Sequence, residues 1–93
     1  MGKSKMQSFE LVWLLAFNVR KLRERREWTR QELAARAGLT HMTVGRIESC
    51  TGEPMLWTVW AVADALGVSV QRLLVDVMGE RDKRVSGNNA APQ

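Results

Sequence analysis

The sequence has a single cysteine, Cys50, and a single histidine, His41, among its 93 residues. One cysteine excludes an intrachain disulfide framework, and one histidine beside it is too few for a structural zinc site. Long hydrophobic runs are also missing, because the longest, at 11–17, is far shorter than the roughly 20 residues that cross a bilayer. No small-residue cleavage site of a signal peptide accompanies it. These absences predict a protein of the reducing cytoplasm with no metal, no cofactor and no membrane partner.

The chain is short and moderately basic. At 93 residues it accommodates one domain at most, which leaves little room for a deep catalytic cleft. Lys and Arg number 14 against 10 Asp and Glu, giving a net charge of +4. This excess permits a nucleic-acid partner without proving one. Because the sequence offers no nucleophile–base pair and no metal cluster, we expect neither an enzyme nor a site for a small-molecule ligand.

Apolar residues recur every three or four positions between two polar ends. This period is typical of amphipathic helices, and almost nothing in the sequence favours a strand. The sequence therefore predicts an all-α domain over 8–78. Residues 1–7 are expected to form a flexible segment, and 79–93, with one Val and no larger apolar residue, a disordered tail. We expect helices at about 8–26, 29–38, 41–49, 54–67 and 69–77.

The spacing of apolar residues also predicts which helix faces enter the core. For the first helix, the expected inward side chains are Leu11, Leu15, Val19 and Leu22. For the fourth helix, they are Leu56, Val59, Trp60, Ala63 and Leu66.

The segment 29–50 carries the most specific local pattern. Thr29 suits a helix N-cap, and Glu32 three residues later completes a capping box. Ala34 supplies a small side chain where two short helices would cross. Gly38 can take the positive φ of a tight turn between them. This order of features predicts a helix-turn-helix.

Three strings match a known family in order: NVRKLRERREWTRQELAARAGLT, then TVGRIE, then LWTVWAVADALGVSVQRLL. Over residues 15–74 the chain resembles the Cro/phage-repressor-like helix-turn-helix regulators, also called the xenobiotic-response-element family. The resemblance implies a five-helix lambda-repressor-like DNA-binding domain, here with an extended first helix. It further implies a transcriptional repressor that binds double-stranded DNA sequence-specifically, as a homodimer on a palindromic operator.

In this family the third helix enters the major groove and the second lies across the DNA backbone. Carried over to this chain, the resemblance implies base readout by His41, Met42, Thr43 and Arg46. Arg46 can bind guanine in a two-pronged fashion. The expected phosphate contacts are Arg30, Gln31, Thr40 and Thr51.

Two further expectations follow from matching family positions. Arg23 and Glu48 correspond to a partly buried ion pair, which favours a structural brace over a DNA contact. Cys50 stands where the family usually has glycine after the third helix, so its backbone is expected to be left-handed. A redox-responsive thiol beside DNA is the alternative reading of Cys50.

The first helix carries a second apolar stripe that the core does not need. We expect it to support a dimer, and packing within the chain remains the alternative. The interface candidates, including one tryptophan at a usually polar family position, are Phe9, Val12, Trp13, Phe17 and Trp57. There are two alternative functions. One is an antitoxin-like protein that binds a partner protein, and the other is a restriction-modification controller that activates transcription as well as represses it.

Overall fold

The computed structural model describes residues 8–76, which form five helices and contain no strand. The helices are α1 (Ser8–Arg25), α2 (Arg30–Ala37), α3 (His41–Glu48), α4 (Leu56–Leu66) and α5 (Val70–Leu73). The all-α, five-helix prediction is confirmed. None of these helices is long and apolar enough to cross a membrane. The segments 1–7 and 79–93, expected to be flexible and disordered, lie outside the described residues.

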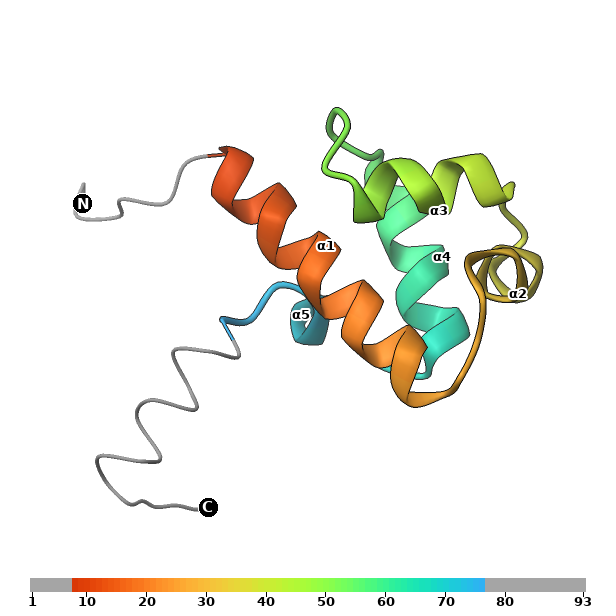
Figure 1. Cartoon of the computed structure of the whole chain (residues 1–93). Coiled ribbons are helices and arrows are strands. Elements are labelled where there is room, and N and C mark those ends of the chain that lie inside the picture. The colour runs from red at the N-terminus through yellow and green to blue at the C-terminus, as the bar shows by residue number, and fades with distance from the viewer. Residues whose placement is uncertain (1–7, 77–93) are drawn as a thin grey trace, which may run out of the picture.

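The long helix α1 crosses the molecule, with α2 and α3 on one side and α5 on the other (Figure 1). It contacts α3, α4 and α5, while α2 packs on α3 and α4. One core joins all five helices, and α3 is therefore fixed by its neighbours rather than by its own eight residues. The buried core side chains are Leu15, Val19, Leu22, Leu33, Ala34, Val44, Ile47, Val59, Val62, Ala63, Leu66 and Leu73.

Hydrogen bonds between near neighbours fix both ends of α2. Thr29 Oγ1 accepts a hydrogen bond from Glu32 N at 3.0 Å, and Glu32 Oε1 accepts one from Thr29 N at 2.7 Å. Gly38 ends the helix at φ 73°. The capping box and the glycine turn are thus present as expected.

Three side chains that were expected in the core are exposed instead. Leu11 is 41% exposed, Leu56 77% and Trp60 58%. Helix α4 turns the smaller Val62 and Ala63 inward, which lets its backbone approach its neighbours closely. Nearly every position of α4 is apolar, so periodicity alone does not decide which stripe is buried. The expectation for Leu56 and Trp60 was wrong for this reason, and that for Leu11 was wrong because α1 buries Leu14, Leu15 and Ala16 on its inward side instead.

The start of α4 and the length of α5 also differ from the prediction. Helix α4 begins at Leu56 rather than Pro54, because the Met55 carbonyl accepts the first helical hydrogen bonds, from Thr58 N and Val59 N. Helix α5 has the expected Ser69 cap but only four residues.

A buried amide, absent from the sequence predictions, holds the end of α5 in place. Asn18 is 1% exposed, in the middle of α1. Its Nδ2 donates hydrogen bonds to the carbonyl oxygens of Leu73 at 2.7 Å and Val75 at 2.9 Å. The last residue of α5 and the chain just after it are thereby tied to α1, through carbonyls that lack a helical partner.

Cys50 takes the left-handed conformation expected of it, at φ 61°. It follows α3 in a helix-ending motif in which Thr51 N donates to the Arg46 carbonyl at 2.9 Å. Gly38 and Gly67 take the same left-handed conformation at the ends of α2 and α4. A side chain at the Cys50 position therefore strains the end of the third helix.

We expect Cys50→Gly to raise the free energy of unfolding by about 1 kcal/mol, because glycine relieves the left-handed strain. Urea denaturation followed by circular dichroism measures the change. Cys50→Ala is the matched control, since it also removes the thiol but keeps the Cβ atom. Equal stability of the two variants would show that backbone strain at residue 50 is negligible.

Candidate nucleic-acid interface

Helix α3 presents one buried and one exposed face. Val44 and Ile47 are buried against the core. His41, Met42 and Arg46 are exposed, Met42 by 61%. Val44 and Ile47, three apart, share the buried face, and Met42 and Arg46, four apart, share the exposed one, while His41 is exposed at the first position of the helix. Three of the four residues expected to read bases thus lie on the outward side of α3.

Thr43, the fourth, is half-buried and takes part in the cap of α3. Thr40 Oγ1 accepts a hydrogen bond from Thr43 N at 3.2 Å, and the two hydroxyl oxygens lie 3.1 Å apart. The two threonines therefore fix the first turn of α3, the part of a recognition helix that approaches DNA first.

The surface beside α3 is hollowed where the chain leads into α4. A cavity of about 320 Å³ is lined by Thr43, Arg46 and Thr51 together with Gly52, Pro54 and other residues up to Thr58. The structure thus brings two expected base-reading residues and one expected phosphate-binding residue to a common cavity. Thr51 Oγ1 lies 2.8 Å from Ser49 Oγ, which orients its hydroxyl.

Arg46 makes no hydrogen bond or ion pair through its guanidinium within residues 8–76. Its backbone carbonyl is occupied by the helix-ending motif, which fixes the position of its Cα atom. An exposed guanidinium on a fixed backbone carries five donors that can reach an external acceptor.

Glu48, the last residue of α3, is fully buried at its side chain and pairs with Arg23 of α1. Arg23 Nε lies 2.7 Å from Oε2, and Nη2 lies 3.0 Å from Oε1, which is a two-pronged pair. Arg23 Nη1 also donates to the Trp28 carbonyl at 2.7 Å. The hydrogen bonds that Arg23 donates to the Glu48 carboxylate raise the pKa of Arg23, and burial opposes this only in part. The pair joins α3 to α1.

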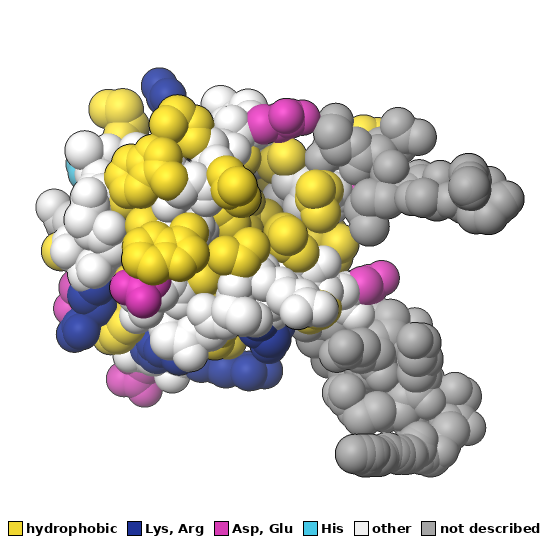
Figure 2. Space-filling model, turned by 180° about the vertical axis from the view of Figure 1, so that it is seen from behind, with side chains coloured by type: hydrophobic (Ala, Val, Ile, Leu, Met, Phe, Trp, Pro, Cys, Tyr) yellow, Lys and Arg dark blue, Asp and Glu magenta, His cyan; other side chains and the backbone are white. Residues whose placement is uncertain are grey.

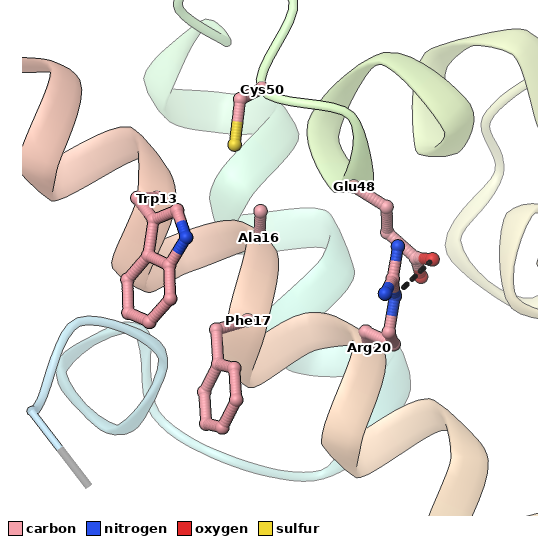
Figure 3. Close-up of a pocket in the computed structure, with 6 residues that line it drawn as sticks. All are labelled: Trp13, Ala16, Phe17, Arg20, Glu48 and Cys50. Carbon is pink, nitrogen blue, oxygen red and sulfur yellow. Dashed lines mark ion pairs between the residues drawn. The ribbon is translucent and has the colours of Figure 1, made fainter. Parts of the chain in front are cut away.

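Two more guanidinium groups approach the same carboxylate. Arg30 Nε lies 3.1 Å from Glu48 Oε1. Arg20 Nε lies 3.8 Å from the same oxygen, and Figure 3 shows this pair. The Arg20 and Arg30 side chains are each about half exposed, at 48% and 49%. Sequence reasoning missed both contacts. One carboxylate among three guanidinium groups leaves this part of the surface with excess positive charge.

The expected phosphate-binding residues occupy three places around α3. Arg30 and Gln31 are exposed at the start of α2, where backbone N–H groups lack helical partners. Thr40 is exposed in the turn, and Thr51 follows α3. Helix starts and turns of this kind suit phosphate oxygens.

The expected dimer residues fall on two helices. On α1, Phe9 is 68% and Trp13 48% exposed, and Val12 and Phe17 are partly buried. Trp13 and Phe17 stack on each other with ring centroids 5.4 Å apart. Figure 3 shows both rings beside Cys50 and Arg20, around a cavity of about 260 Å³. The fifth residue, on α4, is 54% exposed Trp57.

Comparison with known proteins shows that the chain is similar to transcription regulators. A family model described as helix-turn-helix matches residues 19–73. A crystal structure of a hypothetical transcription factor, NHTF, from Neisseria is 27% identical, covering 88% of this chain and 94% of that chain, with a TM-score of 0.74. No curated protein matches the chain.

A second structure, an HTH_3 family transcriptional regulator from Vibrio cholerae, has a similar fold. It is 22% identical, with a TM-score of 0.68, and the alignment covers 72% of this chain. The alignment spans only 38% of that longer regulator.

Proposed function

The chain belongs to the Cro/C1-type helix-turn-helix family of DNA-binding transcription regulators, which are not enzymes, and we propose that it is a repressor that acts as a homodimer on a palindromic operator. The observation that carries the proposal is the outward face of α3. Arg46 is exposed on this face and has no ion pair within residues 8–76. The opposite face of α3 packs in the core through Val44 and Ile47.

We assign base recognition to four residues of α3. Arg46 would pair with O6 and N7 of a guanine, the commonest specific contact in the major groove. His41 can donate to or accept from a base edge. Met42 and the methyl group of Thr43 would contact a thymine methyl. The mixture of one cation, one imidazole and two apolar surfaces supports recognition of a mixed rather than uniform sequence.

Contacts to phosphate would orient the third helix in the groove. Arg30 uses only Nε for Glu48, which leaves its two terminal nitrogens for a phosphate oxygen. Gln31, Thr40 and Thr51 would add neutral contacts from exposed positions. Because each cation displaces counterions from DNA, binding is expected to weaken steeply as the salt concentration rises.

A single recognition helix spans too few base pairs to specify one site in a genome. Two copies related by a two-fold axis would place their α3 helices about 34 Å apart, one helical turn of DNA. A dimer bound across a promoter in the cytoplasm would repress by blocking access of the polymerase.

The direct test is selection from a pool of random duplexes of about 30 base pairs, followed by sequencing of the bound fraction. We expect enrichment of an inverted repeat whose half-sites are centred about one helical turn apart. A single, unrepeated motif would contradict the homodimer but keep sequence-specific binding. No enrichment, with binding lost uniformly as salt rises, would contradict sequence-specific recognition altogether.

A further inference from the structure

A large apolar surface remains uncovered on the side of the molecule that carries α4. Leu56, Trp57 and Trp60 are 77%, 54% and 58% exposed. Because Leu56 and Trp60 are four residues apart and Trp57 and Trp60 three apart, the three side chains are neighbours on one helix face. Figure 2, which views the molecule from behind, shows hydrophobic side chains gathered over this side with charged ones toward the edges.

This surface continues into a groove between three helices. A cavity of about 240 Å³ is lined by Leu11 of α1, Leu56 of α4 and Val70 of α5, with Leu15, Val59 and Leu74. Its walls are almost wholly apolar, and Glu53 is the one charged residue that lines it. We call the surface formed by Leu11, Leu56, Trp57, Trp60, Val70 and Leu74 the α4 face.

The size of the α4 face is that of a protein interface. From the exposed fractions and the areas of such side chains, its apolar surface is on the order of 600 Å², the upper limit for one patch on an ordinary monomer. A stable interface buries roughly 800 Å² on each partner. The α4 face together with the polar residues around it would reach the size of such an interface, so a folded partner can cover this surface.

The remaining segments of this chain are poor candidates for covering the α4 face. Residues 77–93 contain two Val and one Met as their only apolar side chains larger than alanine or proline, among several charged ones. Residues 1–7 contain two Met among polar and basic residues. Neither segment contains an aromatic residue, Leu or Ile, and two Val and one Met are too few to match two exposed indole rings and a groove.

We propose that the α4 face is the surface on which a second copy of this chain docks. In a two-fold dimer each copy supplies the same residues to the interface. The exposed side chains of α4 on one copy can therefore fill the groove of the other, and the reverse. Leu56 and Trp60 of one copy would pack into the groove between Leu11 and Val70 of the other. The proposal rests on the homodimer proposed above and specifies its surface.

The α1 surface around Trp13 is a weaker alternative for this interface. Trp13 and Phe17 already stack on each other, and Arg20 and Glu48 share the lining of their cavity. A partner there would have to desolvate Arg20 beside Glu48, whereas Glu53 is the one charged residue that lines the groove of the α4 face. Of the five interface residues expected from the sequence, Trp57 belongs to the α4 face and Val12 lines the groove beside it.

The test compares Trp60→Arg with the matched Trp13→Arg in the full-length protein, by sedimentation equilibrium over a micromolar concentration series without DNA. Each variant places a charge at a half-exposed tryptophan. We expect Trp60→Arg to raise the dimer dissociation constant about 30-fold or more, as for a central interface residue. We expect Trp13→Arg to change it less than threefold, roughly the effect of a residue outside an interface.

Circular dichroism melting establishes that both variants remain folded. Leu56→Gln is a milder second variant, since Leu56 is 77% exposed and contributes little to the core. It is expected to weaken the dimer in the same direction. In duplex selection, Trp60→Arg should still prefer the half-site bases that wild type prefers, because α3 is untouched.

The possible outcomes separate the surface from the function. If Trp13→Arg dissociates the dimer and Trp60→Arg does not, the α4 face is the wrong surface but the homodimer stands. If the wild type is a monomer and selects no inverted repeat, the homodimer itself is wrong, and the α4 face would belong to a different protein. Loss of the dimer in both α4 variants, with half-site preference kept, supports both proposals.

Discussion

Replacing Glu48 by glutamine is expected to lower the free energy of unfolding by about 3 kcal/mol or more, the largest stability effect of any single substitution considered for this chain. The Glu48 carboxylate is fully buried and has three guanidinium partners, on α1 and α2. A neutral amide cannot balance them. The Arg23 guanidinium, only 12% exposed, would keep its charge without a counter-charge.

Chemical denaturation of the purified variant measures the change, with Asp64→Asn as a control that removes an exposed carboxylate from α4. The double variant Arg23→Met/Glu48→Met should lose less unfolding free energy than Arg23→Met and Glu48→Met lose together as single variants. The double variant leaves neither partner of this pair as an unpaired charge. If Glu48→Gln were as stable as Asp64→Asn, the carboxylate would not brace α3.

The second large effect is expected on DNA binding. On the selected operator, Arg46→Ala should weaken binding by about 2–6 kcal/mol, or roughly 30-fold to 20,000-fold, because a dimer makes each guanine contact twice. The base preference at that position of each half-site should disappear. Binding to unrelated DNA should change little, because the lost contact reads a base.

Arg30→Ala provides the contrasting result. It should weaken binding to operator and unrelated DNA alike and reduce the salt dependence by about one counterion per half-site. Titrations of both variants on both duplexes at several salt concentrations separate the two roles. Since Arg30 also contacts Glu48, its thermal stability must be measured alongside. An Arg46→Ala protein that kept full operator preference would contradict the docking of α3 proposed here.

Residues close together in the chain determined much of the helix-turn-helix by themselves. The Thr29–Glu32 capping box, the Gly38 turn and the left-handed Cys50 involve partners within a few positions. Short-range hydrogen bonds and positive φ angles depend on residue type at fixed spacing, so the sequence is sufficient to predict them. The outward position of Met42 and Arg46 likewise follows from helical period alone.

Only the tertiary structure decided which apolar stripe of α4 is buried, because both stripes satisfy the same period. The burial of Val62 instead of Trp60 depends on how closely neighbouring helices approach, a property of the assembled fold. The same holds for Asn18, whose acceptors are 55 and 57 positions away, and for Glu48, which gathers arginines from α1 and α2. Contacts at such separations leave no periodic or local signal in the sequence, and they appear only when the helices pack around one core.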